Sequence, residues 1–107
     1  MSLMQMLFGK KEPIDLTNSI IVDVRTPSEY AGGHVKGSIN IPLNVLPDKM
    51  KTLSKDKQIV TCCASGMRSG SAESILKKAG YNVVNGGSWA NLLSLIHISE
   101  PTRQAEI

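Results

Sequence analysis

Short runs rich in β-branched residues alternate along the chain with helical segments, and this alternation limits the possible folds more than any other feature. The run from Ser19 to Val24 (SIIVDV) is almost continuously apolar, which is typical of a strand buried on both faces. Further short strands are predicted at 38–41, 58–62 and 82–85. Strands separated by helical segments favour a mainly parallel sheet. We therefore expect a small α/β sandwich with four or five strands and helices on both faces.

Helices are predicted between these strands. The segment Thr26-Pro27-Ser28-Glu29 predicts a helix start, because the threonine can cap, the proline suits the first helical position and the glutamate completes a capping box. The best defined helix is predicted at 68–79, where apolar residues recur at helical spacing and Gly80 follows. A short helix after Pro47 and a final helix complete the set, at 48–53 and 89–95.

The composition describes one small globular domain with an aliphatic core. The chain has 107 residues, 41% of them hydrophobic but only 4% aromatic, so the core must consist mainly of aliphatic side chains. The formal net charge is +3, but no run of lysine and arginine accompanies it. Nucleic acid is therefore not expected as a partner, whereas a small anionic substrate suits the sign of the charge.

Three segments are expected along the chain: an N-terminal arm over 1–12, the domain over 13–93 and a C-terminal tail over 94–107. The apolar arm is expected to pack on the domain, or else to lie on a membrane or a partner. No segment approaches the roughly 18 apolar residues that a transmembrane helix needs. Within the tail, Ser94 to Arg103 (SLIHISEPTR) closely resembles a peptide translated from sequencing-adapter read-through, so we expect the tail to be foreign to the natural gene.

The chain has two cysteines, Cys62 and Cys63, and an adjacent pair does not build a disulfide framework. Thiols that stay reduced indicate the cytoplasm. Because side chains alternate along a strand, Cys62 is expected to be a buried strand residue that faces away from its neighbour. The alternative is that Cys62 acts as a resolving thiol.

Cys63 stands where a strand ends and a helix is about to begin, at the start of Cys63-Ala64-Ser65-Gly66-Met67-Arg68-Ser69. A thiolate at this place meets the positive end of the helix dipole and backbone N–H groups that can point inward. Gly66 permits the tight turn that such a loop needs. Arg68 adds a permanent positive charge. Together these features are expected to lower the pKa of Cys63 and make it a nucleophile.

The same loop carries a family resemblance. The pattern C-x-S-G-x-R-S after a strand is that of the active-site loop of rhodanese-like domains, and residues 63–69 match it at every fixed position. Upstream, residues 23–25, 29–30, 33–35 and 37–42 resemble the family's other signature. The resemblance covers roughly residues 20 to 90. It departs from the family near the end, where Trp89 follows the Gly-Gly pair more closely than usual.

Resemblance to this family implies a sulfurtransferase with Cys63 as its catalytic residue. The thiolate would take the outer sulfur of an anionic donor such as thiosulfate, forming a persulfide, and pass it to cyanide, a thiol or a protein thiol. The loop amides would cradle the persulfide, and Arg68 would hold the loop and stabilise the leaving anion. The substrate-binding residues implied are Ala64, Ser65, Gly66, Met67, Arg68 and Ser69. No cofactor is implied.

Two other functions are compatible with the same fold. Related phosphatases hold phosphate in a C-x5-R loop, whereas the spacing from Cys63 to Arg68 is C-x4-R; counting from Cys62 gives the longer spacing. Such phosphatases have a histidine before the cysteine, where this chain has Thr61. The other alternative is a catalytically idle module that only binds a partner, against which the intact Cys63, Gly66 and Arg68 argue.

Other polar residues near the loop are interpreted as structural. Asp23, Arg25 and Glu29 are expected to form an ion-pair and capping cluster, although Asp23 and Arg25 could also support the site and Arg25 could attract anions. His34 is expected to bond the backbone rather than to act as a base. The domain has too few ligands for a zinc site.

Overall fold

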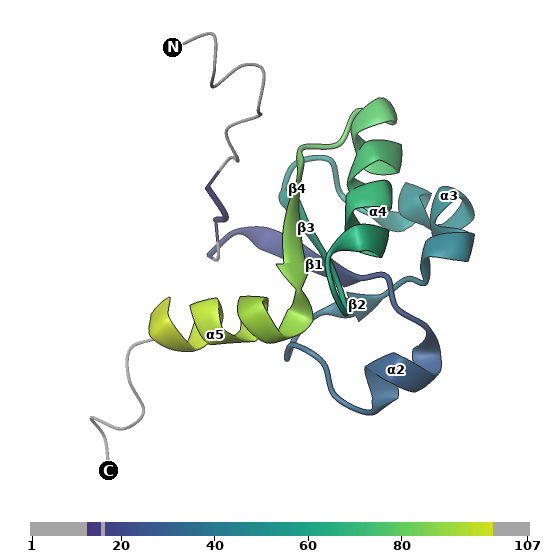
Figure 1. Ribbon diagram of the computed structural model, residues 1–107. Coiled ribbons are helices and arrows are strands. Elements are labelled where there is room, and N and C mark those ends of the chain that lie inside the picture. The colour runs from purple at the N-terminus through teal and green to yellow at the C-terminus, as the bar shows by residue number, and fades with distance from the viewer. Residues whose placement is uncertain (1–12, 16, 100–107) are drawn as a thin grey trace, which may run out of the picture.

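The fold is a small α/β sandwich built on one parallel sheet (Figure 1). The computed structural model describes residues 13–15 and 17–99. Its four strands pair in the order β2-β1-β3-β4, and every neighbouring pair is parallel. Their bounds are Ser19–Asp23 for β1, Ile39–Asn40 for β2, Gln58–Cys63 for β3 and Val83–Ser88 for β4. The predicted α/β fold with a parallel sheet is therefore confirmed.

Each strand is followed along the chain by a helix, in the predicted order. Their bounds are Pro27–Ala31 for α2, Leu46–Lys49 for α3, Met67–Lys78 for α4 and Trp89–Ser99 for α5, with 3-10 turns η1 (Leu43–Val45) and η2 (Met50–Thr52) on either side of α3. The predicted capping box at the start of α2 is confirmed. The Glu29 N–H donates to Thr26 Oγ1, and the Thr26 N–H donates to Glu29 Oε1.

Several predicted bounds differ from the structure, most of them by one residue, and the final helix predicted at 89–95 continues to Ser99. The short helix predicted at 48–53 begins earlier, at Leu46, because that side chain is fully buried and Pro47 fits the first turn. The strand predicted at 82–85 continues to Ser88, because β4 goes on pairing with β3 beyond a bulge. α5 passes the domain boundary expected after residue 93. The arm at 1–12 and the tail from 100 onward lie outside the described residues.

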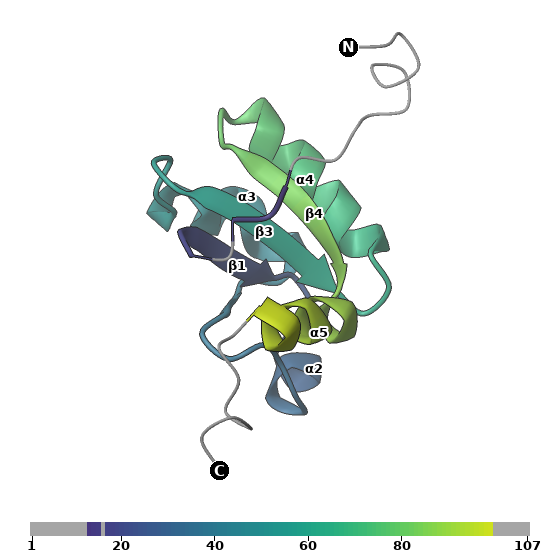
Figure 2. The same cartoon turned by 90° about the vertical axis from the view of Figure 1, so that its left-hand side faces the viewer.

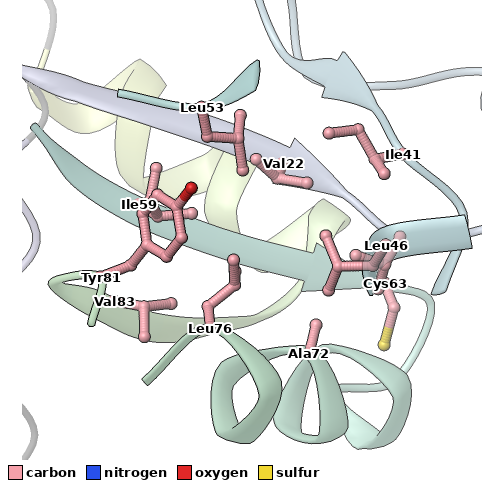
Figure 3. Close-up of a cluster of buried hydrophobic side chains, with 11 residues drawn as sticks. Val22, Ile41, Leu46, Leu53, Ile59, Cys63, Ala72, Leu76, Tyr81 and Val83 are labelled. Carbon is pink, nitrogen blue, oxygen red and sulfur yellow. The ribbon is translucent and has the colours of Figure 1, made fainter. Parts of the chain in front are cut away.

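Helices cover both faces of the sheet, as predicted (Figure 2). α3 and α4 pack on one face and α5 on the other. The side chains of β3 alternate between the two: Ile59 and Cys63 join the cluster under α4, and Val60 and Cys62 join the cluster against α5. Figure 3 shows the first cluster, with Cys63 beside the start of α4. The alternation of one strand therefore separates the two adjacent cysteines.

The order of the strands indicates where a ligand would bind. β1 and β3 are neighbours in the sheet, but the chain leaves β1 toward β2 and leaves β3 toward β4. In parallel α/β sheets, ligands usually bind at the carboxyl ends of two strands that diverge in this way. The carboxyl end of β3 is Cys63. Within residues 13–15 and 17–99, no helix has the length and apolar character needed to cross a membrane.

Candidate active site

Cys63 is the last residue of β3, and backbone N–H groups of the following turn point at its sulfur. The Gly66 N–H donates to Cys63 Sγ at 2.9 Å, and the Ser69 N–H approaches it at 3.4 Å. Gly66 is the N-cap of α4 and has φ 105°, a left-handed conformation that favours glycine. The predicted nest of donors at the start of α4 is therefore present, and Gly66 is the residue that permits it.

The two cysteines differ in acidity. Burial raises the pKa of Cys63, but hydrogen bonds to the sulfur outweigh burial and bring the pKa below its ordinary value. The donors are the Ser69 hydroxyl and the N–H groups of Ser69, Gly66 and Ser65. For Cys62, burial raises the pKa to about 12, and the negative charge of Asp23 acts in the same direction. Cys63 is therefore the thiol suited to nucleophilic attack, and Cys62 is a buried strand residue as predicted.

Two buried hydroxyl groups hold the first turn of α4 against β3. Thr61 Oγ1 donates to the Ser69 carbonyl at 2.9 Å, so the position that carries a histidine in the related phosphatases here fastens the helix to the strand. Ser69 Oγ lies 3.4 Å from Cys63 Sγ. Cys63 itself has no exposed surface. A donor can therefore reach the sulfur only if the loop above it shifts.

Arg68 pairs with Glu29 of α2 through both ends of its guanidinium group. Arg68 Nη1 donates to Glu29 Oε1 at 2.8 Å, and Arg68 Nη2 donates to Glu29 Oε2 at 3.0 Å. Each side chain is 37% exposed, so water screens the pair only in part. The Arg68 hydrogen bond is the main reason that the pKa of Glu29 falls to about 2, and the backbone N–H of Thr26 adds to the effect. The pair connects α2 to the first turn of α4, next to the loop that follows Cys63.

Asp23 and Arg25 form the buried structural pair that was predicted. The guanidinium group donates to both carboxylate oxygens of Asp23, with the shortest distance 2.8 Å. It also donates to the carbonyls of Glu29 and Gly33, and it lies over the Trp89 ring, 4.8 Å from the ring centre. Arg25 is only 4% exposed. A donor anion could bind Arg25 only by displacing these contacts, so the structural interpretation is the better one.

The remaining loop residues form its outer surface. Ala64 and Ser65 are exposed, and Met67 is 81% exposed. His34 lies away from this chemistry: its Nδ1 is 2.7 Å from the Tyr30 carbonyl and its ring stacks on the Tyr30 ring. The prediction that His34 bonds the backbone is confirmed.

Two features of the site are not evident from the sequence pattern. One is the Glu29–Arg68 ion pair, which joins residues 39 positions apart. The other is Asn85 of β4, whose side chain bonds Ser69 Oγ at 2.7 Å and the Gly66 carbonyl at 3.2 Å. The only signal for Asn85 in the sequence is a polar residue directly after the apolar Val83-Val84 pair.

Comparison with known proteins identifies related sequences. The sequence matches the family described as Rhodanese-like domain over residues 8–91. It is 36% identical over 70 residues to a protein of Allochromatium vinosum called Sulfurtransferase, covering 65% of each chain. It is 41% identical over 69 residues to Thiosulfate sulfurtransferase PspE of Escherichia coli, covering 62% of this chain and 66% of PspE. The chain thus spans slightly less than two thirds of the length of both relatives.

A solved structure gives the same result for the fold. The structure titled "rhodanese with anions from E. coli" superposes with a TM-score of 0.65 at 36% sequence identity. The match covers 68% of this chain and 89% of that chain. The shared region therefore includes most of the domain.

Proposed function

The chain belongs to the family of rhodanese-like domains, and on that premise we propose that it is a sulfurtransferase in which Cys63 carries a sulfane sulfur. The donor is thiosulfate or a persulfide, and the acceptor is cyanide, a thiol or a protein thiol. The names of the relatives, Sulfurtransferase and Thiosulfate sulfurtransferase PspE, support the class of reaction. The chemistry of a reduced thiolate leads us to propose the cytoplasm as its location.

In the first half of the proposed cycle, the Cys63 thiolate attacks the outer sulfur of thiosulfate. A bond forms between Sγ and that sulfur, and the bond between the two sulfurs of thiosulfate breaks. Its electron pair leaves with sulfite, so no general base is needed for a cysteine that is already a thiolate. The N–H groups of Gly66 and Ser69, which now face Sγ, favour the thiolate from which the attack starts.

In the second half, a nucleophilic acceptor attacks the outer sulfur of the Cys63 persulfide. The new bond joins the acceptor to that sulfur, and the bond to Sγ breaks. The electron pair returns to Sγ, which becomes a thiolate again in the same nest of donors. We propose that Arg68 acts at the mouth of the loop, where it could stabilise the departing anion if its pair with Glu29 opens.

One observation carries the proposal: the sulfur of Cys63, and not that of Cys62, lies in the nest at the start of α4. The C-x5-R register of a phosphatase would require Cys62 as nucleophile. The pKa of Cys62, raised to about 12 by burial, argues against that register. The donors arranged around Cys63 likewise favour an active thiol over an idle module.

Intact-mass spectrometry tests the proposal directly. The protein is incubated with thiosulfate, excess thiosulfate is removed, and the intact mass is measured. We expect the mass to increase by one sulfur atom. The same sample should lose that mass when cyanide or a thiol is added. Cys63→Ser should gain no sulfur, whereas Cys62→Ser should gain it. A protein that gains no sulfur from thiosulfate or from a small persulfide would refute the proposed function.

A further inference from the structure

The side-chain amide of Asn85 is bonded at both ends to the loop that holds Cys63. Asn85 Oδ1 accepts from the Ser69 hydroxyl at 2.7 Å and from the Gly87 N–H at 2.8 Å. Asn85 Nδ2 donates to the Gly66 carbonyl at 3.2 Å. Gly66 and Ser69 are the residues whose N–H groups face Cys63 Sγ. One amide on β4 therefore holds both of these residues in place.

The Ser69 hydroxyl has one hydrogen and two acceptors within reach. Asn85 Oδ1 is 2.7 Å from Ser69 Oγ, and Cys63 Sγ is 3.4 Å from it. While the sulfur is neutral, the Ser69 hydroxyl donates its hydrogen bond to Asn85 Oδ1, and Ser69 Oγ can accept a hydrogen bond from the thiol S–H. When the sulfur is negative, a charge-assisted bond to it becomes the stronger one. The Gly87 N–H still satisfies Asn85 Oδ1 when the hydroxyl turns away.

We propose that Asn85 is a positioning residue of the sulfur-transfer cycle: it takes the Ser69 hydrogen bond while Cys63 Sγ is neutral and releases it when charge returns to Sγ. The inference rests on the proposed function. In the persulfide the charge lies on the outer sulfur, and Sγ is neutral. As the acceptor removes the outer sulfur, the electron pair returns to Sγ, and the Ser69 hydroxyl turns toward it. The rotation transfers no proton and needs no other reactant.

Two other titratable groups near Cys63 take no part in this exchange between Ser69 and Asn85. Arg68 of α4 and Cys62 of β3 interact electrostatically with the thiol. Arg68 is bound to Glu29, and Cys62 lies on the other face of the sheet. Neither is a hydrogen-bond partner of Asn85 in the described part of the chain. Asn85 is linked to the sulfur through the Ser69 hydroxyl and through the backbone of Gly66, and only the hydroxyl can change its acceptor.

A double-mutant cycle tests the proposal. Asn85→Asp and Asn85→Ala are each made in the parent protein and in Ser69→Ala, and the pKa of Cys63 is measured from the pH dependence of its alkylation by iodoacetamide. Asn85→Asp retains the shape of the side chain and accepts the Ser69 hydrogen bond more strongly, but it loses the Nδ2 donor to the Gly66 carbonyl. Because that loss is common to both Ser69 backgrounds, the pKa of Cys63 should still rise more when Ser69 is present than when it is absent. Asn85→Ala removes the acceptor of the Ser69 hydroxyl, which is then free to donate to Cys63 Sγ. The coupling of Asn85→Ala with Ser69 in the pKa of Cys63 should therefore have the opposite sign.

We expect each coupling to change the alkylation rate at about pH 6 by roughly threefold or more. Equal shifts of the pKa in both Ser69 backgrounds would overturn the proposal, because Asn85 would then act only through charge or loop structure. Asn82→Asp, which adds the same charge at an exposed position just before β4, is the matched control and should show no coupling with Ser69. If Asn85→Asp does not fold, the Asn85→Ala arm decides.

Alkylation requires no sulfur donor, so this result is separate from the proposed function. A failure of Cys63 to take up sulfur would be seen by intact-mass spectrometry, whatever the result of the double-mutant cycle. A second readout uses turnover with thiosulfate and cyanide. Because the released hydrogen bond stabilises Sγ as a leaving group, Asn85→Asp should lower kcat more than it changes KM for thiosulfate. A change confined to KM would contradict the proposed role.

Discussion

Cys62 and Cys63 are consecutive residues of β3, yet their side chains lie on opposite faces of the sheet. Cys63 belongs to the cluster under α4, and Cys62 belongs to the cluster against α5. The two thiols also differ in acidity, since hydrogen bonds lower the pKa of Cys63 and burial raises the pKa of Cys62 to about 12. Each cysteine can therefore be substituted with little effect on the surroundings of the other.

The first prediction is that Cys63→Ser abolishes thiosulfate:cyanide sulfur transfer, because a serine hydroxyl is not ionised at neutral pH. Cys62→Ser should retain most of the activity per folded molecule. It should unfold more easily, by about 1–3 kcal/mol, because a hydroxyl replaces a buried thiol. Thiocyanate formation and denaturant unfolding measure the two effects. If the phenotypes were exchanged, the nucleophile would be Cys62 and the assignment of the loop would be wrong.

The second prediction concerns the thiolate. Because the pKa of Cys63 lies below its ordinary value, the alkylation rate in the native protein should rise with pH along a curve whose midpoint lies below the 9.0 of an ordinary thiol. Sulfur uptake should fall as the pH drops through the same pKa, since protonation removes the nucleophile. Mass spectrometry should find one adduct in native protein, on Cys63, and two after unfolding. A native thiol that titrates at or above the ordinary value would contradict the role of the loop donors.

The third prediction concerns the Glu29–Arg68 pair. The pKa of Glu29 is depressed from 4.5 to about 2, so its contribution to stability is present above pH 4.5 and is lost as the pH falls toward 2. Glu29→Gln should therefore unfold more easily than the parent at neutral pH, and the difference should shrink over this acid range. Urea unfolding at several pH values measures it. Glu73→Gln, which removes the i,i+4 pair with Lys77 within α4, serves as control.

The fourth prediction distinguishes sulfur transfer from phosphate ester hydrolysis. The Gly66 N–H lies 2.9 Å from Cys63 Sγ, a fit to one sulfur atom that an extra residue in the loop would disturb. Insertion of a glycine between Ser65 and Gly66 should abolish sulfur transfer, while the parent should not hydrolyse a small aryl phosphate above background. Both assays are run on the same preparations. Phosphate release by the parent that depends on Cys62, without sulfur uptake, would instead favour the phosphatase.

The fifth prediction concerns Gly86 of β4, which lies at the irregularity in the pairing of β4 with β3. A Cβ at this position would lie 2.8 Å from Val60 Cγ1 and 2.9 Å from the Thr61 carbonyl oxygen. Since the backbone cannot yield easily, Gly86→Ala should cost about 1–3 kcal/mol of the free energy of unfolding. Gly32→Ala, at φ −76° with only ordinary contacts, should cost much less. Equal effects of the two substitutions on denaturant unfolding would contradict the close contact at Gly86.

The sequence by itself determined those features of this protein that depend on residues close together along the chain. The alternation of apolar runs with helical segments indicated the parallel α/β fold, because strand and helix periodicity depend on neighbouring residues. The capping box of α2 and the glycine at the start of α4 were evident for the same reason, since their bonds join residues at most a few positions apart. The opposite orientations of Cys62 and Cys63 likewise followed from strand geometry alone.

The tertiary structure decided which distant residues complete the loop. Glu29 meets Arg68 only because β1 and β3 are neighbours, which places the start of α2 beside the start of α4. Asn85 reaches Ser69 and Gly66 only because β4 pairs with β3 in the register that sets Asn85 opposite Thr61. A shift of one residue would turn Asn85 to the other face. Register and helix docking result from packing of the whole core, which a local pattern does not contain.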